Sequence, residues 1–146
     1  MNLEATLNTY RPYALAALRV ATALAFMAHG TQKLFGFPVR MGGGAAPAMM
    51  SLLWFAAILE TLGGALIILG LFTRPVAFLL SGQMAFAYFI AHHPKSPFPA
   101  LNGGDAAILF CFVFLYLAAA GAGPWSLDAQ RRGRFWMHPH GTDSSK

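Results

Sequence analysis

The sequence predicts an all-α fold, a four-helix transmembrane bundle. Of the 146 residues, 57% are hydrophobic and 10% are charged, whereas a typical soluble domain carries about 25% charged residues. The charges stand in short clusters, separated by apolar runs near the ~20 residues that a helix needs to cross a bilayer. A soluble globule of this composition would have too little polar surface, but lipid accepts apolar surface directly. We therefore expect an integral membrane protein whose partner is the lipid bilayer.

Four apolar stretches define the expected helices, at about residues 13–35, 48–72, 75–91 and 105–120. Pro47 is well placed to open the second helix. Thr73-Arg74 leaves so tight a turn that the second and third helices must be antiparallel neighbours. Glycines 42–44 mark a first loop, and the proline-rich and glycine-containing stretch 94–104 a third. The prediction is one membrane domain at 13–128, between an N-terminal tail at 1–12 and a basic C-terminal tail at 129–146.

The basic residues predict that both ends of the chain lie in the cytoplasm. With four spans, the N-terminus, the second loop and the C-terminal tail share one side, which holds Arg11, Arg74, Arg131, Arg132, Arg134 and Lys146. The other side holds Lys33, Arg40 and Lys95. Because cytoplasmic segments carry the excess of Lys and Arg, this imbalance places the first set in the cytoplasm.

Composition also argues against several classes of function. The net charge is +5, but no basic stripe with interleaved aromatic residues suggests a nucleic-acid partner. The basic tail is better suited to anionic lipid. The one cysteine, Cys111, lies in an apolar run, so no disulfide, CxxC redox pair or zinc quartet is expected. No spacing of histidines and carboxylates indicates a metal site.

Polar side chains inside the apolar runs are the candidate site. An ionisable group in a span costs roughly 2.5–3.5 kcal/mol on insertion scales, so such groups usually face the bundle interior. Arg19, His29 and Lys33 share one helical face, and Tyr116 belongs to a stripe on the fourth helix with Asp105, Leu109 and Phe112. The predicted intramembrane pocket comprises Arg19, His29, Glu60, Gln83 and Tyr116.

Arg19 and Glu60 admit two interpretations. They form a buried ion pair that fixes the register of the helices, or they belong to a polar pocket that binds a small molecule or relays protons. Gly63 and Gly64 follow Glu60 at helical spacing and would let another helix approach closely. Lys33 is expected to extend to the membrane interface.

The third loop and the histidines have mainly structural interpretations. Asn102, Gly103 or Gly104 is expected to cap the fourth helix, with Asp105 in its first turn. Haem bound between two of His29, His92 and His93 is the weaker alternative, because His92 and His93 are adjacent rather than one helical turn apart. A rigid lid formed by the prolines of this loop stays open as an alternative.

Several motifs together resemble the DoxX family across residues 15–128. They are Arg19 with the run 29–36 (HGTQKLFG), the run 60–64 (ETLGG), the run 70–75 (GLFTRP), the run 101–105 (LNGGD) and the run 123–128 (GPWSLD). Their order and spacing match throughout, although the position of Asp105 is commonly Glu in that family. The resemblance implies a four-helix membrane bundle, in agreement with the count of spans, and a bacterial inner-membrane location.

The resemblance also implies a function linked to redox chemistry. Members of the family are described as membrane oxidoreductases connected with quinones, so quinone is the expected cofactor or substrate. No dinucleotide or phosphate-binding motif and no redox cysteine pair is present, so electrons would come from a soluble partner protein. One alternative is a non-enzymatic scaffold that anchors soluble redox proteins through the basic tail. A small-molecule permease ranks last, because four helices need a homo-oligomer to enclose a path.

Overall fold

The computed structural model describes residues 3–40 and 44–136, and over these ranges the chain is helical without strands. The all-α prediction is therefore confirmed. The elements are α1 (Leu3–Leu34), α2 (Leu52–Ile58), η2 (Leu59–Gly63), α3 (Gly64–Leu69), α4 (Thr73–Ala87), η3 (Tyr88–His92), α5 (Pro99–Asn102), α6 (Asp105–Ala120) and α7 (Leu127–Trp136). The segments η2 and η3 are single π-helical turns; η2 lies between α2 and α3, and η3 ends the helix that begins with α4.

Three helical stretches are long and apolar enough to cross a membrane: Leu3–Leu34, Leu52–Leu69 and Thr73–His92. The fourth, Asp105–Ala120, is apolar and shorter, about 24 Å at the helical rise. A bilayer core of ~30 Å must thin locally around such a helix, or the helix must lie with little tilt. The four-helix bundle is as predicted, and the fourth helix has the predicted bounds.

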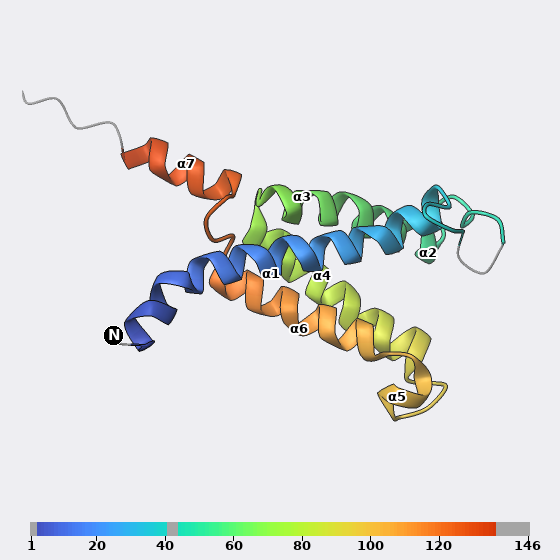
Figure 1. The fold of residues 1–146 in the computed structure, drawn as a ribbon. Helices are drawn as coiled ribbons and strands as arrows, with labels where there is room; N and C mark the ends of the chain where they lie inside the picture. Colours follow the sequence, from blue (N-terminus) through green and yellow to red (C-terminus); the bar gives the residue numbers. More distant parts are fainter. Residues whose placement is uncertain (1–2, 41–43, 137–146) are drawn as a thin grey trace, which may run out of the picture.

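The first helix begins earlier than predicted. It starts at Leu3 rather than near residue 13, so most of the predicted N-terminal tail is helical. Glu4 in the first turn favours this start because a carboxylate complements the helix dipole there. Pro12 lies inside α1, and proline removes one backbone hydrogen bond and bends a helix. The N-terminal turns of α1 are angled away from the rest of the helix (Figure 1).

The second span is shorter than predicted at both ends. Its start is set by Ser51, whose Oγ accepts a hydrogen bond from the backbone N–H of Trp54 at 3.1 Å, and not by Pro47. Its end is set by Gly70, which adopts a left-handed conformation with φ of 64°. Glycine is the residue that adopts this conformation without steric cost.

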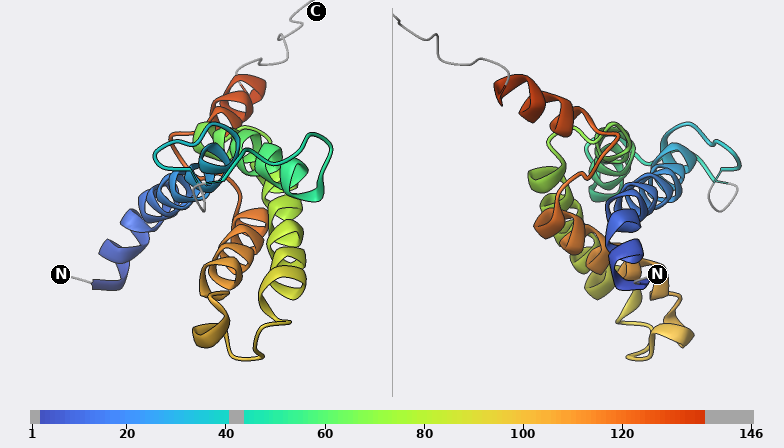
Figure 2. Two further views of the ribbon diagram at one scale, coloured as in Figure 1. Left: turned by 90° about the vertical axis from the view of Figure 1, so that its right-hand side faces the viewer. Right: turned by 60° about the vertical axis from the view of Figure 1, so that its left-hand side comes forward.

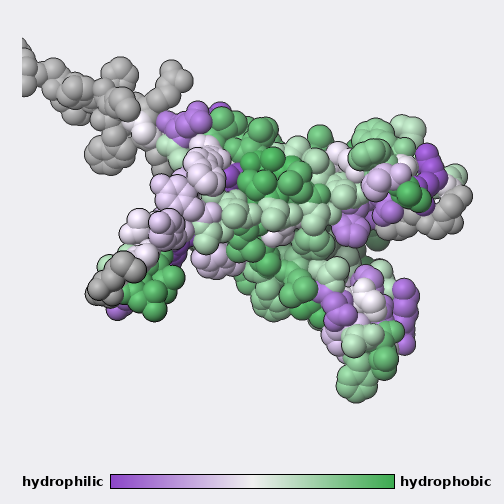
Figure 3. Space-filling model, viewed as in Figure 1, coloured by the Kyte–Doolittle hydropathy of each residue, from purple (hydrophilic) through white to green (hydrophobic). Residues whose placement is uncertain are grey.

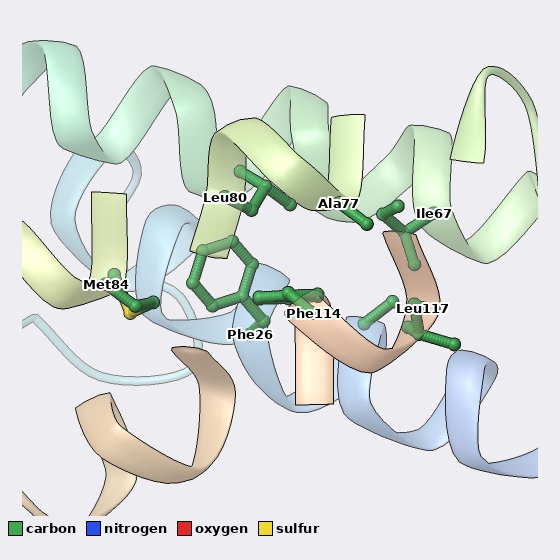
Figure 4. Close-up of a cluster of buried hydrophobic side chains, with 8 residues drawn as sticks. Phe26, Ile67, Ala77, Leu80, Met84, Phe114 and Leu117 are labelled. Carbon is green, nitrogen blue, oxygen red and sulfur yellow. The ribbon is translucent and has the colours of Figure 1, made fainter. Parts of the chain in front are cut away.

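The helices form two pairs that diverge toward one end of the molecule. Helix α1 lies along the second span and α4 lies along α6, and the pairs separate toward α2 and α5 (Figures 1 and 2). Where the pairs meet, a core of buried side chains joins them, with Phe26, Ile67, Ala77, Leu80, Met84, Phe114 and Leu117 labelled in Figure 4. The rings of Phe26 and Phe114 meet edge to face, with centroids 4.8 Å apart.

Gly63 and Gly64 permit the close helix contacts that the sequence predicts. A Cβ at Gly63 would lie 2.8 Å from Leu80 of α4, and one at Gly64 would lie 2.8 Å from Met27 of α1. Both distances are shorter than carbon atoms tolerate, so a side chain at either position would force the neighbouring residue to shift. The second span therefore packs between α1 and α4 through its two glycines.

The C-terminal segment returns to the turn between α3 and α4. The carboxylate of Asp128 accepts hydrogen bonds from the backbone N–H groups of Phe72 at 3.0 Å and Thr73 at 2.9 Å. Helix α7 then leaves the bundle (Figure 2), so the predicted C-terminal tail is helical as far as Trp136, and residues 137–146 lie outside the described residues. The C-terminal segment and the second turn thus share one end of the bundle, as an even number of spans requires.

The surface agrees with a membrane setting. In Figure 3, hydrophobic residues cover the middle of the visible face, and hydrophilic residues gather toward the ends of the helices and around α7. Large apolar side chains such as Phe78, Leu109 and Phe112 are each more than 60% exposed. In water such a surface would be unfavourable, whereas acyl chains cover it at little cost.

Candidate functional site

A cavity of about 240 Å³ lies in the wedge between the two diverging helix pairs. Its lining residues come from α1, η2, α4, η3 and α6 and from the loop before α6: Phe26, His29, Lys33, Glu60, Met84, Ala87, His92, Gly103, Ala106, Ala107 and Phe110. His29 on α1, Gly103 in the loop before α6 and Ala106 on α6 are exposed, so the mouth lies between α1 and the start of α6. The wall is largely apolar, and the ionisable groups come from α1 and the two π-helical turns.

Lys33 and Glu60 form an ion pair in this cavity. The ammonium Nζ of Lys33 lies 2.5 Å from Oε1 and 2.6 Å from Oε2 of Glu60. The side chains are 12% and 4% exposed, respectively. The predicted pairing of Glu60 with Arg19 is therefore wrong, and so is the prediction that Lys33 extends away to the interface.

The position of Glu60 along the bundle explains this exchange of partners. The second span begins at Leu52 and not near residue 48, so Glu60 lies closer to the first loop than predicted and beyond the reach of Arg19. Glu60 also lies in the π-helical turn η2. Such turns widen a helix by one residue and occur frequently at functional sites. The wide turn and the late helix start bring the carboxylate level with Lys33.

A close contact between α1 and η2 fixes the spacing of the ion pair. A Cβ at Gly30 would lie 2.7 Å from the backbone nitrogen of Thr61 and 2.9 Å from the carbonyl oxygen of Ala57. The Thr61 hydroxyl donates to that same carbonyl at 2.8 Å. Gly30 therefore lets the two backbones touch one turn before Lys33, which holds the ammonium over the carboxylate.

Arg19 is a structural residue at the other end of the bundle. It is fully buried, and Nη1 donates to the carbonyl oxygens of Ile67 and Ile68, each at 2.7 Å. Nη2 donates to the carbonyl oxygen of Trp125 at 2.8 Å. The guanidinium thus ties α1 to the end of α3 and to the segment that precedes α7, and it does not line the cavity.

Gln83 and Tyr116 also lie away from the cavity. The amide nitrogen of Gln83 donates to the carbonyl oxygen of Ala56 at 3.2 Å, which joins α4 to α2. The Tyr116 side chain is 47% exposed, as part of a stripe on α6 that points outward together with Leu109 and Phe112. The period of three and four residues placed this stripe on one face correctly, but apolar periodicity in lipid does not distinguish the inner face from the outer one.

His29 lies at the mouth of the cavity, as the helical face shared with Lys33 indicates. Its ring meets Phe110 of α6 edge to face, with centroids 5.9 Å apart. Two residues of the predicted pocket, His29 and Glu60, therefore line the cavity, together with Lys33, which was not predicted there. The run HGTQK carries both basic residues on one face, so this part of the site was visible in the sequence.

His92 is a cavity residue that sequence reasoning did not include in the pocket. It ends the π-helical turn η3, and its Nδ1 lies 3.1 Å from the carbonyl oxygen of Asn102. Asn102 is 5% exposed. In the sequence, His92 was considered only as a haem ligand, because no residue pattern predicts a hydrogen bond to a backbone carbonyl across a loop.

Asn102 organises the third loop rather than capping α6 directly. Its Nδ2 donates to the carbonyl oxygen of Ser96 at 2.7 Å, and its Oδ1 accepts from the backbone N–H of Gly104 at 2.7 Å. Gly104 is the N-cap of α6, and Asp105 occupies the first turn as predicted. Gly103 adopts a left-handed conformation with φ of 68°, the kind of turn that glycine permits.

Within residues 3–40 and 44–136, no group of three or more His, Cys, Asp or Glu side chains could hold a metal ion. Cys111 is a free thiol whose backbone carbonyl accepts a hydrogen bond from Ser81 of α4 at 2.9 Å. The cavity therefore offers an ion pair and two imidazoles in an apolar wall.

Comparison with known proteins identifies the family. The DoxX family profile matches residues 14–93. A protein of Haemophilus influenzae (strain Rd) described as uncharacterized is 46% identical over 125 residues, which cover 84% of this chain and 93% of the relative. The inner membrane protein YphA of Escherichia coli (strain K12) is 32% identical over 126 residues, covering 81% of this chain and 90% of YphA. No solved structure matches. The chain is a helical membrane protein that belongs to the DoxX family.

Proposed function

We propose that the cavity binds the ring of a lipid-soluble quinone, and that the protein is a quinone-linked oxidoreductase or the membrane subunit of a redox complex. The relative YphA is named an inner membrane protein, and we place this chain in the inner membrane as well. The N-terminus and α7 then face the cytoplasm, and the cavity lies toward the opposite face, where a soluble redox partner would supply or take the electrons.

The lateral mouth of the cavity is the observation that carries this proposal. Exposed lining residues on α1 and α6, His29 and Ala106, frame the opening. Both helices belong to the apolar part of the molecule, so a ligand dissolved in the bilayer reaches the cavity without crossing water.

The size and lining of the cavity suit a ring better than a whole quinone. Its volume of about 240 Å³ lies below the ~300–1,000 Å³ of pockets that enclose drug-sized ligands. Phe26, Phe110 and Met84 supply apolar surface for the ring, and the Lys33–Glu60 pair supplies polar groups. The long apolar tail of a quinone would remain outside, in the lipid.

The experiment is purification in nanodiscs formed with native membrane lipid, followed by mass spectrometry of the organic extract. A photoreactive azido-quinone, followed by peptide mapping, then locates the binding site. We expect adducts on peptides from α1 and α6 that contain lining residues such as His29 and Phe110. Labelling spread evenly over the lipid-facing surface, with no quinone in the extract, would reject the proposal.

Two variants separate a binding role from a folding role. Glu60→Gln keeps the size of the side chain and removes its charge. Because the Lys33 ammonium then loses the partner that holds it, we expect the folded fraction to show a changed yield of azido-quinone labelling. Tyr116→Phe is the matched control, because the ring points outward and is 47% exposed. Equal labelling of both variants and the parent protein would place the ligand outside the cavity.

A scaffold function is the second candidate, and helix α7 favours it. This helix projects from the bundle (Figure 2) and carries exposed Arg131, so it offers a basic surface to a soluble protein. The two candidates differ in their ligand. A scaffold would purify without quinone and show no saturable quinone labelling.

A further inference from the structure

His92 holds a defined hydrogen atom on one ring nitrogen. Its Nδ1 lies 3.1 Å from the backbone carbonyl oxygen of Asn102. A carbonyl oxygen only accepts hydrogen bonds, so Nδ1 must carry the hydrogen and donate it. In the neutral imidazole, Nε2 then has no hydrogen and presents a lone pair. The same logic governs histidines whose tautomer is set by a carbonyl partner in metal and catalytic sites.

The partner of His92 is held firmly in place. Asn102 is 5% exposed, its amide nitrogen donates to Ser96, and its amide oxygen accepts from Gly104, each over 2.7 Å. These bonds fix the residue on both sides of its backbone carbonyl. The peptide that carries this carbonyl is held as well, because the backbone N–H of Gly103 donates to the carbonyl oxygen of Pro99 at 3.1 Å. The tautomer of His92 is therefore set by the third loop.

The opposite side of the cavity also presents an acceptor. The carboxylate of Glu60 accepts hydrogen bonds and donates none. Lys33 is the strongest donor in the cavity, but its ammonium is directed at both oxygens of Glu60, 2.5 Å and 2.6 Å away. The fixed polar groups therefore favour a ligand that brings its own hydrogen-bond donors.

We infer that the cavity selects the reduced, dihydroxy form of the quinone ring, and that Nε2 of His92 accepts a hydrogen bond from one of its hydroxyl groups. A quinone carries two carbonyl oxygens, which are acceptors only, whereas a hydroquinone carries two O–H donors. The inference rests on the proposed function, because it names the redox state that this same cavity prefers.

The experiment compares the two redox states of one short-tailed ring, decylubiquinone and decylubiquinol. Binding to the full-length protein in nanodiscs is measured anaerobically, with empty nanodiscs to correct for partition into lipid. One net hydrogen bond corresponds to a preference of about three- to tenfold in dissociation constant. We expect the reduced form to bind more tightly by that factor.

Variants at His92 test whether that side chain causes the preference. In His92→Asn the amide reaches only the position of Nδ1, so we expect the ratio of the two affinities to fall to about one. In His92→Gln the amide oxygen reaches the position of Nε2, so part of the preference should return. His93→Asn is the matched control, because His93 adjoins His92 and does not line the cavity. We expect it to keep the preference of the parent protein.

Each result separates the inference from the function on which it rests. If neither redox state binds above the empty nanodisc, the proposed function fails. If both states bind equally to the parent protein, the quinone function stands and the inference about the reduced form is overturned. The melting temperature shows whether His92→Asn folds. If the parent protein and a folded His92→Asn variant both prefer the reduced state, the assignment to His92 is overturned. If His92→Asn does not fold, the ratio of the two affinities is compared between His92→Gln and the parent protein, and this comparison tests the assignment to His92.

Discussion

Lys33, and not Arg19, is the cation that neutralises Glu60, with its ammonium nitrogen 2.5 Å and 2.6 Å from the two carboxylate oxygens. The two basic residues of α1 thus have separate roles. Arg19 binds backbone carbonyls at the end where α7 begins, and Lys33 balances a carboxylate at the end where the helix pairs diverge.

Replacing Lys33 by Met should destabilise the protein by about 3–5 kcal/mol, because the carboxylate of Glu60 would be left buried without a partner. The measurement is unfolding in mixed micelles with increasing mole fraction of SDS. The double variant Lys33→Met/Glu60→Met should recover most of the loss, since it buries neither charge. A single variant as stable as the parent would show that the pair is not a buried one in the membrane.

Arg19→Lys should weaken the attachment of the C-terminal segment, although the charge is kept. An ammonium cannot reproduce the planar fork that reaches Ile67, Ile68 and Trp125 together. Loss of one charge-assisted hydrogen bond costs roughly 1.5–3 kcal/mol. Limited proteolysis in nanodiscs should therefore cleave the stretch 121–128 faster than in the parent. An unchanged cleavage rate would contradict the structural role assigned to Arg19.

Gly30→Ala should destabilise the bundle, because its Cβ would lie 2.7 Å from the backbone nitrogen of Thr61. Gly82→Ala is the matched control: Gly82 is also helical, and a Cβ there meets nothing within 4 Å. Alanine is favoured over glycine within helices by about 1 kcal/mol, so the control should be neutral or stabilising. Melting temperatures of the two variants in the same detergent provide the comparison, and equal shifts would exclude a close contact at Gly30.

Both ends of the chain should be cytoplasmic and the third loop should lie on the opposite side. In a Cys111→Ala background, a cysteine placed at Ser96 should react in intact cells with a maleimide that does not cross the inner membrane. A cysteine placed at Arg131 should react only after the cells are opened. The reverse pattern would invert the topology and put the cavity at the cytoplasmic end.

The fold was largely predictable because membrane insertion leaves a strong signal. Apolar runs of span length identify helices directly, and the tight turn at Thr73-Arg74 fixes the pairing of the second and third. The positions of the helix ends were harder to predict from the sequence. The Ser51 cap and the left-handed conformation of Gly70 are local features, and they shorten the second span at both ends.

The candidate site was predictable only in part. The helical period correctly grouped His29 with Lys33, but a shift in the start of the second span changed the partner of Glu60. The prediction that Tyr116 lines the pocket was wrong for a different reason. A polar group on an apolar helix faces either the bundle interior or the membrane interface, and the sequence does not distinguish the two. The role of His92 depends on a backbone carbonyl across a loop, and no residue pattern encodes such a contact.

Because the cavity opens between α1 and α6, its occupancy depends on the concentration of the ligand in the membrane. A molecule that enters from the acyl-chain region is present there at a mole fraction fixed by its partition into the membrane, and its aqueous concentration hardly matters. Modest intrinsic attraction then suffices to keep the cavity filled in a cell. The same property means that dilution into micelles would empty it, so retention through purification depends on the ratio of detergent to native lipid.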